Sequence, residues 1–168
     1  ERNNGAFKDY FITFSETPTL QKVVGNNIRE KVRNLQGADW GMSTNLQATF
    51  DLILNSAVRE SLPESEMPTK LLIISDMEFN QADRYQTNLD SIRQKYSNAG
   101  YKMPEIVFWN VNGRMGNVPA SVNDLGIGLV SGFSPSILKS ILKGEIYSPL
   151  QLMLDTVDTA RYSCIRTE

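Results

Sequence analysis

Two short runs of apolar residues constrain the fold of this chain more than any other feature. KLLIIS (residues 70–75) and EIVFWNVN (residues 105–112) each contain four apolar residues in succession. Such a run, rich in β-branched and aromatic residues, is typical of a strand that is buried on both faces of a parallel sheet. We therefore expect both runs to lie inside a mostly parallel sheet.

The rest of the chain alternates between strand patterns and helical patterns. Strands are predicted at residues 9–15, 19–23 and 126–131. Helices are predicted at residues 26–36, 44–62, 83–98, 135–143 and 149–161. Strands that alternate with helices predict a single α/β domain over residues 1–168.

Composition excludes several classes of function. The 17 basic and 19 acidic residues give a net charge of −2, which provides no global basic footprint for nucleic acid. The chain has no histidine, so Ser-His-Asp triads, Cys-His dyads and most zinc sites are excluded. Cys164 is the only cysteine, which favours a cytoplasmic location. No apolar run is long enough to span a membrane, so we expect no membrane partner.

Polar residues follow the predicted strands where functional sites are usually found. Ser15, Asp76 and Asn112 stand at the carboxyl ends of strands, where ligands of open α/β sheets bind. Asp76 and Glu78 have the chemistry of an acid–base pair, but no nucleophile accompanies them in the sequence. An aspartate that follows a strand is also a common turn former, so both interpretations stay open.

The segment GADWGMSTN (residues 37–45) precedes a predicted helix and has two interpretations. Thr44 and Gln47 fit a capping box, in which the threonine only caps the helix. Alternatively, the Thr44 hydroxyl and the Asp76 carboxylate would suit a hard cation, because Mg²⁺ prefers oxygen ligands.

The order of FITFS, GMSTNLQ, KLLIISDMEF and EIVFWNVN resembles a von Willebrand factor A-type (vWA) domain. It is most similar to a little-characterised branch of intracellular and viral proteins that carry such a domain in their C-terminal half. That branch is related in architecture to the A domain of the Ro ribonucleoprotein. The resemblance implies a Rossmann-like, three-layer α/β fold with a mostly parallel central sheet.

The resemblance also implies a metal-ion-dependent adhesion site. Thr44 and Asp76 match two of the family's Mg²⁺ ligands, and Asn45 and Glu78 would lie on the rim of the site. The family's Asp-x-Ser-x-Ser loop and first strand have no counterpart here. Since each buried unpaired backbone group costs roughly 1–3 kcal/mol, we expect residues 1–168 to be an incomplete folding unit, complemented by a missing segment or another chain.

Three classes of function follow from these observations. The first is a protein-interaction module without enzymatic activity, in which a partner's carboxylate completes the metal site. The second is an accessory domain of an RNA-binding ribonucleoprotein, to which Arg29, Lys31 and Arg33 would contribute a small basic cluster. The third, less favoured, is a metal-dependent enzyme with Asp39 as an additional ligand. Trp40 is either a partner anchor or a residue packed over a loop.

Overall fold

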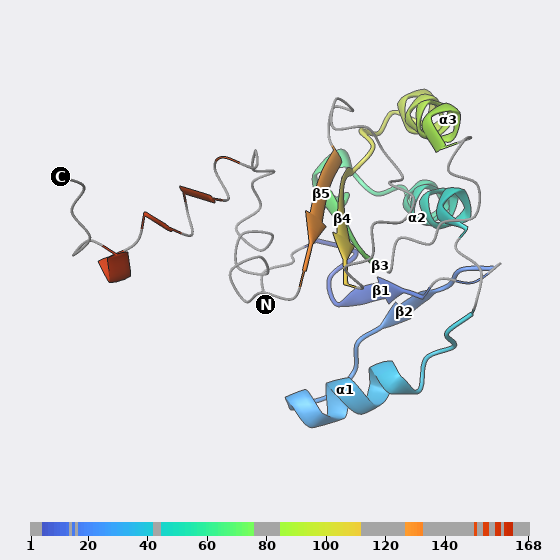
Figure 1. The fold of residues 1–168 in the computed structure, drawn as a ribbon. Helices are drawn as coiled ribbons and strands as arrows, with labels where there is room; N and C mark the ends of the chain where they lie inside the picture. Colours follow the sequence, from blue (N-terminus) through green and yellow to red (C-terminus); the bar gives the residue numbers. More distant parts are fainter. Residues whose placement is uncertain are drawn as a thin grey trace. The chain divides into compact units, whose positions relative to one another are not determined.

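The computed structural model divides the chain into two compact units (Figure 1). The first comprises Glu1–Thr69 and Phe79–Pro104, and the second comprises Lys70–Glu78 and Glu105–Glu168. The structure describes residues 5–13, 15, 17–41, 45–75, 85–111, 127–132, 150, 153, 154, 157, 158 and 160–162.

A β-hairpin opens the first unit. β1 (Tyr10–Ile12) pairs antiparallel with β2 (Leu20–Lys22), with Tyr10 opposite Lys22. The Lys22 ammonium lies 5.6 Å from the centre of the Tyr10 ring, a cation–π contact across the two strands. The predicted strands are confirmed but shorter than expected. Among the described strands, β1 pairs only with β2, so the prediction that Ser15 follows a strand of the parallel sheet is wrong.

Two helices supply most of the buried residues of the first unit. α2 (Leu46–Arg59) and α3 (Tyr85–Asn98) contact each other. Each carries apolar residues at helical spacing, and the side chains of that face are buried. The buried apolar residues of the two helices are Leu46, Phe50, Ile53, Leu54, Ala57, Leu89, Ile92 and Tyr96. Both helices were predicted, with boundaries within two or three residues.

The described part of the first unit also contains two further helices. α1 (Ile28–Gln36) follows the hairpin, and a short 3₁₀ helix, η1 (Glu64–Glu66), follows α2. The Tyr101 hydroxyl donates a hydrogen bond to the Leu62 carbonyl oxygen at 2.8 Å, which ties the chain after α3 to the segment that leads into η1.

A parallel sheet forms the second unit. β3 (Lys70–Ser75), β4 (Glu105–Asn110) and β5 (Ile127–Ser131) are arranged in the order β3-β4-β5, and both neighbouring pairs are parallel. The predicted mixed α/β architecture with a parallel sheet is thus confirmed. A 3₁₀ helix, η3 (Ala160–Tyr162), lies near the C-terminus of this unit. The helix predicted at 135–143 and most of that at 149–161 lie outside the described residues.

The two faces of the parallel sheet differ in burial. Ile73, Ile106 and Phe108 are buried on one face. On the other face, Leu72 and Ile74 are 37% and 53% exposed, although both lie within the apolar run of β3. The prediction that residues 70–75 are buried on both faces is therefore wrong for one face. Val107 and Gly128, in register with Leu72 on this face, are buried, whereas Trp109 and Val130, in register with Ile74, are half-buried.

Candidate functional site

The carboxyl edge of the parallel sheet carries a row of three polar residues. Ser75, Asn110 and Ser131 end β3, β4 and β5 and are aligned in register. Because parallel neighbours in register share a face, the row continues the buried face, whose preceding layer includes Ile73 and Phe108. Ser75 and Asn110 are half-buried and Ser131 is exposed. This row lies where ligands of parallel sheets bind.

The polar row has the chemistry of a binding site. Hydroxyl and amide groups donate and accept hydrogen bonds but do not act as general bases near neutral pH. The backbone beyond the strands is held in place, since Val111 N–H donates to the Ser75 carbonyl and Gly132 N–H donates to the Asn110 carbonyl, both at 3.1 Å. These two hydrogen bonds fix the backbone at the carboxyl edge of the sheet.

Of the four predicted metal-site residues, only Asn45 belongs to the described part of the chain. Thr44, Asp76 and Glu78 lie outside it, as does Asn112. Asn45 is the N-cap of α2, and its side-chain oxygen accepts a hydrogen bond from Ala48 N–H at 3.0 Å. The predicted capping box at Thr44 is therefore wrong by one position.

The described residues contain no group of three or more histidine, cysteine, aspartate or glutamate side chains that could hold a metal ion. Asp39, the additional ligand of the enzyme hypothesis, is exposed. The Mg²⁺ site of Thr44 and Asp76 accordingly stays a prediction.

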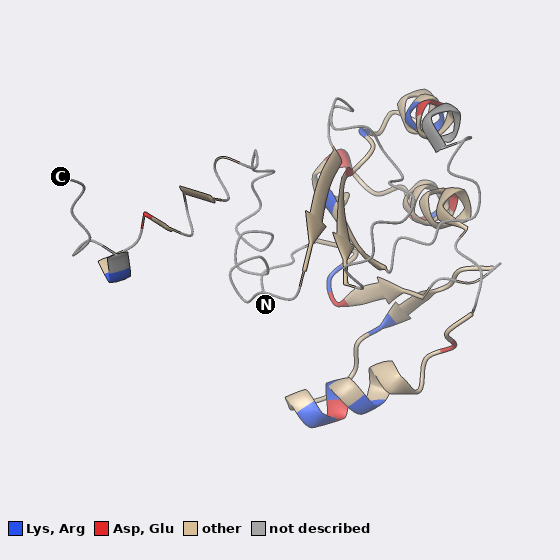
Figure 2. Ribbon diagram, viewed as in Figure 1, with Lys and Arg blue, Asp and Glu red and all other residues tan. Residues whose placement is uncertain are grey.

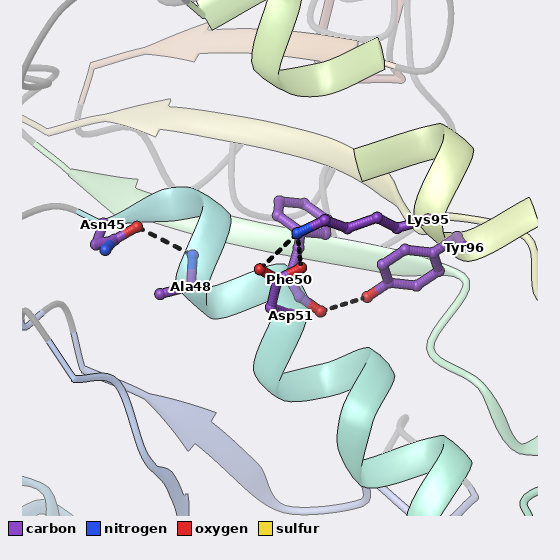
Figure 3. A network of polar contacts seen from close by, with 6 residues as sticks. All are labelled: Asn45, Ala48, Phe50, Asp51, Lys95 and Tyr96. Atoms are coloured by element: carbon purple, nitrogen blue, oxygen red, sulfur yellow. Dashed lines mark hydrogen bonds and ion pairs between the residues drawn. The ribbon is translucent and has the colours of Figure 1, made fainter. Parts of the chain in front are cut away.

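A network of polar contacts joins α2 to α3 (Figure 3). The Tyr96 hydroxyl donates to the Phe50 carbonyl oxygen at 3.0 Å. The neighbouring residues form an ion pair, in which the Lys95 ammonium lies 2.7 Å and 2.8 Å from the two carboxylate oxygens of Asp51. Burial raises the pKa of the Tyr96 phenol above its usual range, and the nearby Asp51 charge adds to the shift. Both side chains of the ion pair are at least one-third exposed, so solvent weakens their attraction. The network is best explained as helix packing.

Helix α1 is held by local hydrogen bonds at both ends. At its start, the Asn27 side chain accepts from Glu30 N–H, and Glu30 in turn accepts from Asn26 N–H. The Asn34 side chain accepts from Val24 N–H, which ties the helix to the segment after β2. At its end, Gly37 N–H donates to the Arg33 carbonyl. These caps satisfy helix-end groups that would otherwise be left to water.

The apolar side chains of α1 contribute little to any core. No residue of α1 is buried. Ile28, Val32 and Leu35 lie on one face of the helix, and we call them the α1 apolar stripe. Ile28 is 77% exposed, Val32 is also exposed, and Leu35 is half-buried.

Trp40 lies close to the end of the α1 apolar stripe. Its indole N–H donates to the Leu35 carbonyl oxygen at 3.1 Å, while 61% of the residue is exposed. The alternative that Trp40 packs over a loop does not account for this exposure. A tryptophan whose polar end is fixed and whose rings face water has the properties of a binding anchor.

Basic residues border the α1 apolar stripe. Arg29 and Lys31 lie on either side of it in a helix of 3.6 residues per turn, and Arg33 lies further round the helix. Figure 2 shows these cations along α1, interrupted by Glu30. Glu30 follows Ile28 by two residues and so lies on the opposite side of the helix, which leaves Arg29 and Lys31 as the charges beside the stripe.

Sequence reasoning identified the helix but not this surface. The spacing of residues 28, 32 and 35 predicts a helix but does not show whether its apolar face is buried or exposed. The available signal was the composition of the helix itself, since four of its nine residues are charged and only three are apolar. None of the described helices is long and apolar enough to cross a membrane.

Comparison with known proteins places the chain beside uncharacterised relatives. Residues 2–161 match the model of a family described as "Domain of unknown function (DUF7788)". The chain is 35% identical over 161 residues to "Uncharacterized protein L728" of Acanthamoeba polyphaga mimivirus, covering 94% of this chain and 28% of that protein. No solved structure matches.

These findings correct the family assignment that we drew from short motifs. The match is to DUF7788 and no vWA family matches, so the resemblance to vWA domains is wrong. FITFS, GMSTNLQ and IISD are short segments, and their order did not identify the family. The adhesion-site residues inferred from that order lose the support of the resemblance.

Proposed function

Because this chain belongs to the DUF7788 family, a domain of unknown function, we propose its role from its own surface: it is a protein-interaction module without enzymatic activity. The observation that carries the proposal is α1, which exposes the α1 apolar stripe and has no buried residue. A helix of nine residues is marginally stable by itself, and apolar burial is the usual source of its stability. Here caps hold the helix, which leaves its apolar face available to a partner.

The chemistry of this surface defines the partner. Ile28 and Val32 provide exposed aliphatic groups, and Trp40 provides a fixed aromatic anchor at the other end. Arg29 and Lys31 supply positive charge on both sides. An acidic amphipathic helix, with apolar residues at helical spacing and carboxylates beside them, is complementary to such a surface.

The ribonucleoprotein alternative has one supporting observation, the cations of α1. Arg29, Lys31 and Arg33 would contact phosphates. That reading leaves the exposed aliphatic residues unexplained, because RNA-binding helices and sheets use aromatic and cationic groups. We also expect a cytoplasmic location for the protein and a three-layer arrangement for the complete fold.

Selection of a peptide partner tests the proposal. Displayed helical peptides are selected against the full chain, and their affinities are then measured for the wild type, Val32→Glu and Trp40→Ala. We expect the selected peptides to be acidic and amphipathic, and each variant to weaken binding about tenfold or more.

Val58→Glu provides the matched control. Val58 is an exposed valine on α2, so this variant introduces the same charge at a comparable degree of exposure elsewhere. Peptides that bind Val32→Glu as well as wild type would overturn the proposal. Tight binding of a single-stranded RNA that weakens steeply with salt, and that Val32→Glu leaves unchanged, would favour the ribonucleoprotein alternative.

A further inference from the structure

The first unit contains a groove between its two longest helices, which we call the α2–α3 groove. Its volume is about 460 Å³, within the range of about 300–1,000 Å³ that ligand pockets occupy. Each lining residue belongs to α2, to α3 or to the position directly after α3, and all of them lie in the first unit. The lining residues are Asp51, Leu54, Asn55, Lys95, Asn98 and Ala99.

The charges of the α2–α3 groove balance each other. Among the described residues that line it, only Asp51 and Lys95 are charged, and they form the ion pair drawn in Figure 3. Both side chains stay at least one-third exposed, so a ligand can reach either charge from the solvent. Because an exposed ion pair contributes little to stability, a ligand can separate the two charges at small cost.

Two amide side chains lie beside the ion pair. Asn55 is one turn from Asp51 on α2 and has no side-chain hydrogen bond within the described part of the chain. Asn98 is one turn from Lys95 on α3. Its side-chain oxygen accepts from the Gln94 amide at 3.0 Å, and none of the described residues accepts from its NH₂ group. The groove therefore combines an acidic group, a basic group and two amides with free donors.

We propose that the α2–α3 groove binds a small zwitterion, a free α-amino acid with a short aliphatic side chain. The ligand ammonium takes the place of Lys95 at the Asp51 carboxylate, and the ligand carboxylate accepts hydrogen bonds from Lys95 and Asn98. A ligand with a single charge replaces only one half of the ion pair and leaves the other half without a partner. A zwitterion supplies a partner to both halves.

The remaining lining residues account for the aliphatic side chain. Leu54 is 7% exposed and Ala99 presents a methyl group, so the apolar contact area is small. None of the described lining residues is aromatic, and the groove thus offers no stacking platform for a ring. A side chain of the size of valine fits this small apolar area.

This site is separate from the surface on which the proposed function rests. The described residues that line the α2–α3 groove include none from α1. Val32→Glu, which alters the α1 apolar stripe, should accordingly leave binding in the groove unchanged. Failure of either proposal therefore leaves the other standing.

Saturation-transfer NMR on the full chain tests the proposal with L-valine as the probe. In so open a groove we expect a dissociation constant of about 1–10 mM. Asp51→Asn and Lys95→Met should each weaken binding about tenfold, because each removes one of the two charge contacts. Asp90→Asn is the matched control, since it removes the acid of another exposed ion pair on α3, formed with Arg93 at 2.9 Å. It should bind L-valine as wild type does.

Ligand analogues keep the proposal testable if a variant fails to fold. Isovalerate is L-valine without the ammonium, and isobutylamine is L-valine without the carboxylate. We expect wild type to bind each of them at least about fivefold more weakly than L-valine.

Three outcomes of these experiments would overturn the proposal. The first is the absence of saturation transfer from wild type to L-valine at about 50 mM, well above the expected dissociation constant. The second is binding of isovalerate or isobutylamine as tight as that of L-valine, which would mean that a single charge is recognised. The third is equal affinity of wild type, Asp51→Asn and Lys95→Met for L-valine, which would place the ligand elsewhere.

Discussion

The Tyr96 hydroxyl on α3 donates a hydrogen bond to the backbone carbonyl oxygen of Phe50 on α2, at 3.0 Å. The same two residues meet through their rings, whose centres lie 6.2 Å apart at an interplanar angle of 74°. Both residues are almost completely buried. An edge-to-face ring pair combined with a buried hydrogen bond fixes the position of α3 along α2.

Removal of this hydroxyl should destabilise the protein moderately. We expect Tyr96→Phe to lower the free energy of unfolding by about 1 kcal/mol, because one buried hydrogen bond is lost and the ring stays in place. Tyr96→Ala should lower it by about 3–5 kcal/mol, because the ring is lost as well. Urea denaturation measures both values. Tyr10→Phe, which removes a hydroxyl from an exposed residue, should change the free energy by less than about 0.5 kcal/mol.

The same residue should make stability depend on alkaline pH. Burial raises the pKa of folded Tyr96, so above about pH 10 the unfolded chain releases this proton while the folded chain retains it. The unfolded state then binds fewer protons, and the stability falls as pH rises. The loss approaches about 1.4 kcal/mol per pH unit. The urea midpoint is measured from about pH 9 to about pH 11, a range that brackets the ordinary tyrosine pKa. Over this range the midpoint should fall more for wild type than for Tyr96→Phe. Parallel curves would contradict the assignment.

Capping of α2 provides a direct comparison of two adjacent residues. Asn45→Ala should lower the free energy of unfolding by about 1 kcal/mol, because Ala48 N–H loses its acceptor. Asn45→Asp should retain most of the stability, since aspartate is an equally good cap. Thr44→Ala should have an effect below about 0.5 kcal/mol. Thermal melts followed by circular dichroism distinguish these cases, and a larger loss for Thr44→Ala would restore the capping box predicted from the sequence.

Gly25 and Gly100 should differ in their tolerance of alanine. Both have positive φ angles, +150° and +81°, so alanine at either position is strained by about 1 kcal/mol. At Gly25, an added Cβ would also lie 2.7 Å from the Lys31 backbone nitrogen and 2.8 Å from the Glu30 Cβ. At Gly100 it would meet nothing within 4 Å. Gly25→Ala should therefore be the more damaging substitution, and equal unfolding free energies would contradict this account.

Binding of Mg²⁺ can be tested without knowledge of a partner. Asp76 follows Ser75, the last residue of β3, directly in the sequence. If Asp76 is a ligand, Mg²⁺ at ten times its dissociation constant should stabilise the wild type by about 1.4 kcal/mol relative to EDTA. Asp76→Ala should fold normally and lose this response, whereas Asp90→Ala should keep it. An equal response in wild type and Asp76→Ala would exclude Asp76 as a ligand.

Local patterns predicted the described strands and helices well because these patterns record which side chains repeat on one face. β3 was predicted with its observed boundaries, Lys70–Ser75, because its apolar run has clear polar ends. The strand predicted at residues 9–15 extends only to Ile12, since its pairing with β2 ends there. Propensity alone carries no information about where a partner strand stops.

The candidate surfaces were harder to predict because periodicity does not show what covers an apolar face. The spacing of Ile28, Val32 and Leu35 is the same whether the face is buried or exposed. The apolar run of β3 likewise indicated burial on both faces, whereas Leu72 and Ile74 are exposed. For β3 the pattern correctly indicated apolar residues and only the predicted burial of both faces was wrong, whereas for α1 the pattern predicted the helix and not its environment.

The division of the chain has a consequence during synthesis on the ribosome. β3 belongs to the second unit, but the segment that follows it, Phe79–Pro104, belongs to the first. At roughly 5–20 residues per second, about 2–7 s separate the completion of β3 from that of its neighbour β4. During this interval LLII is an apolar segment of the nascent chain without its strand partner. Ribosome-bound chaperones that recognise short aliphatic segments would therefore meet this one before β4 does.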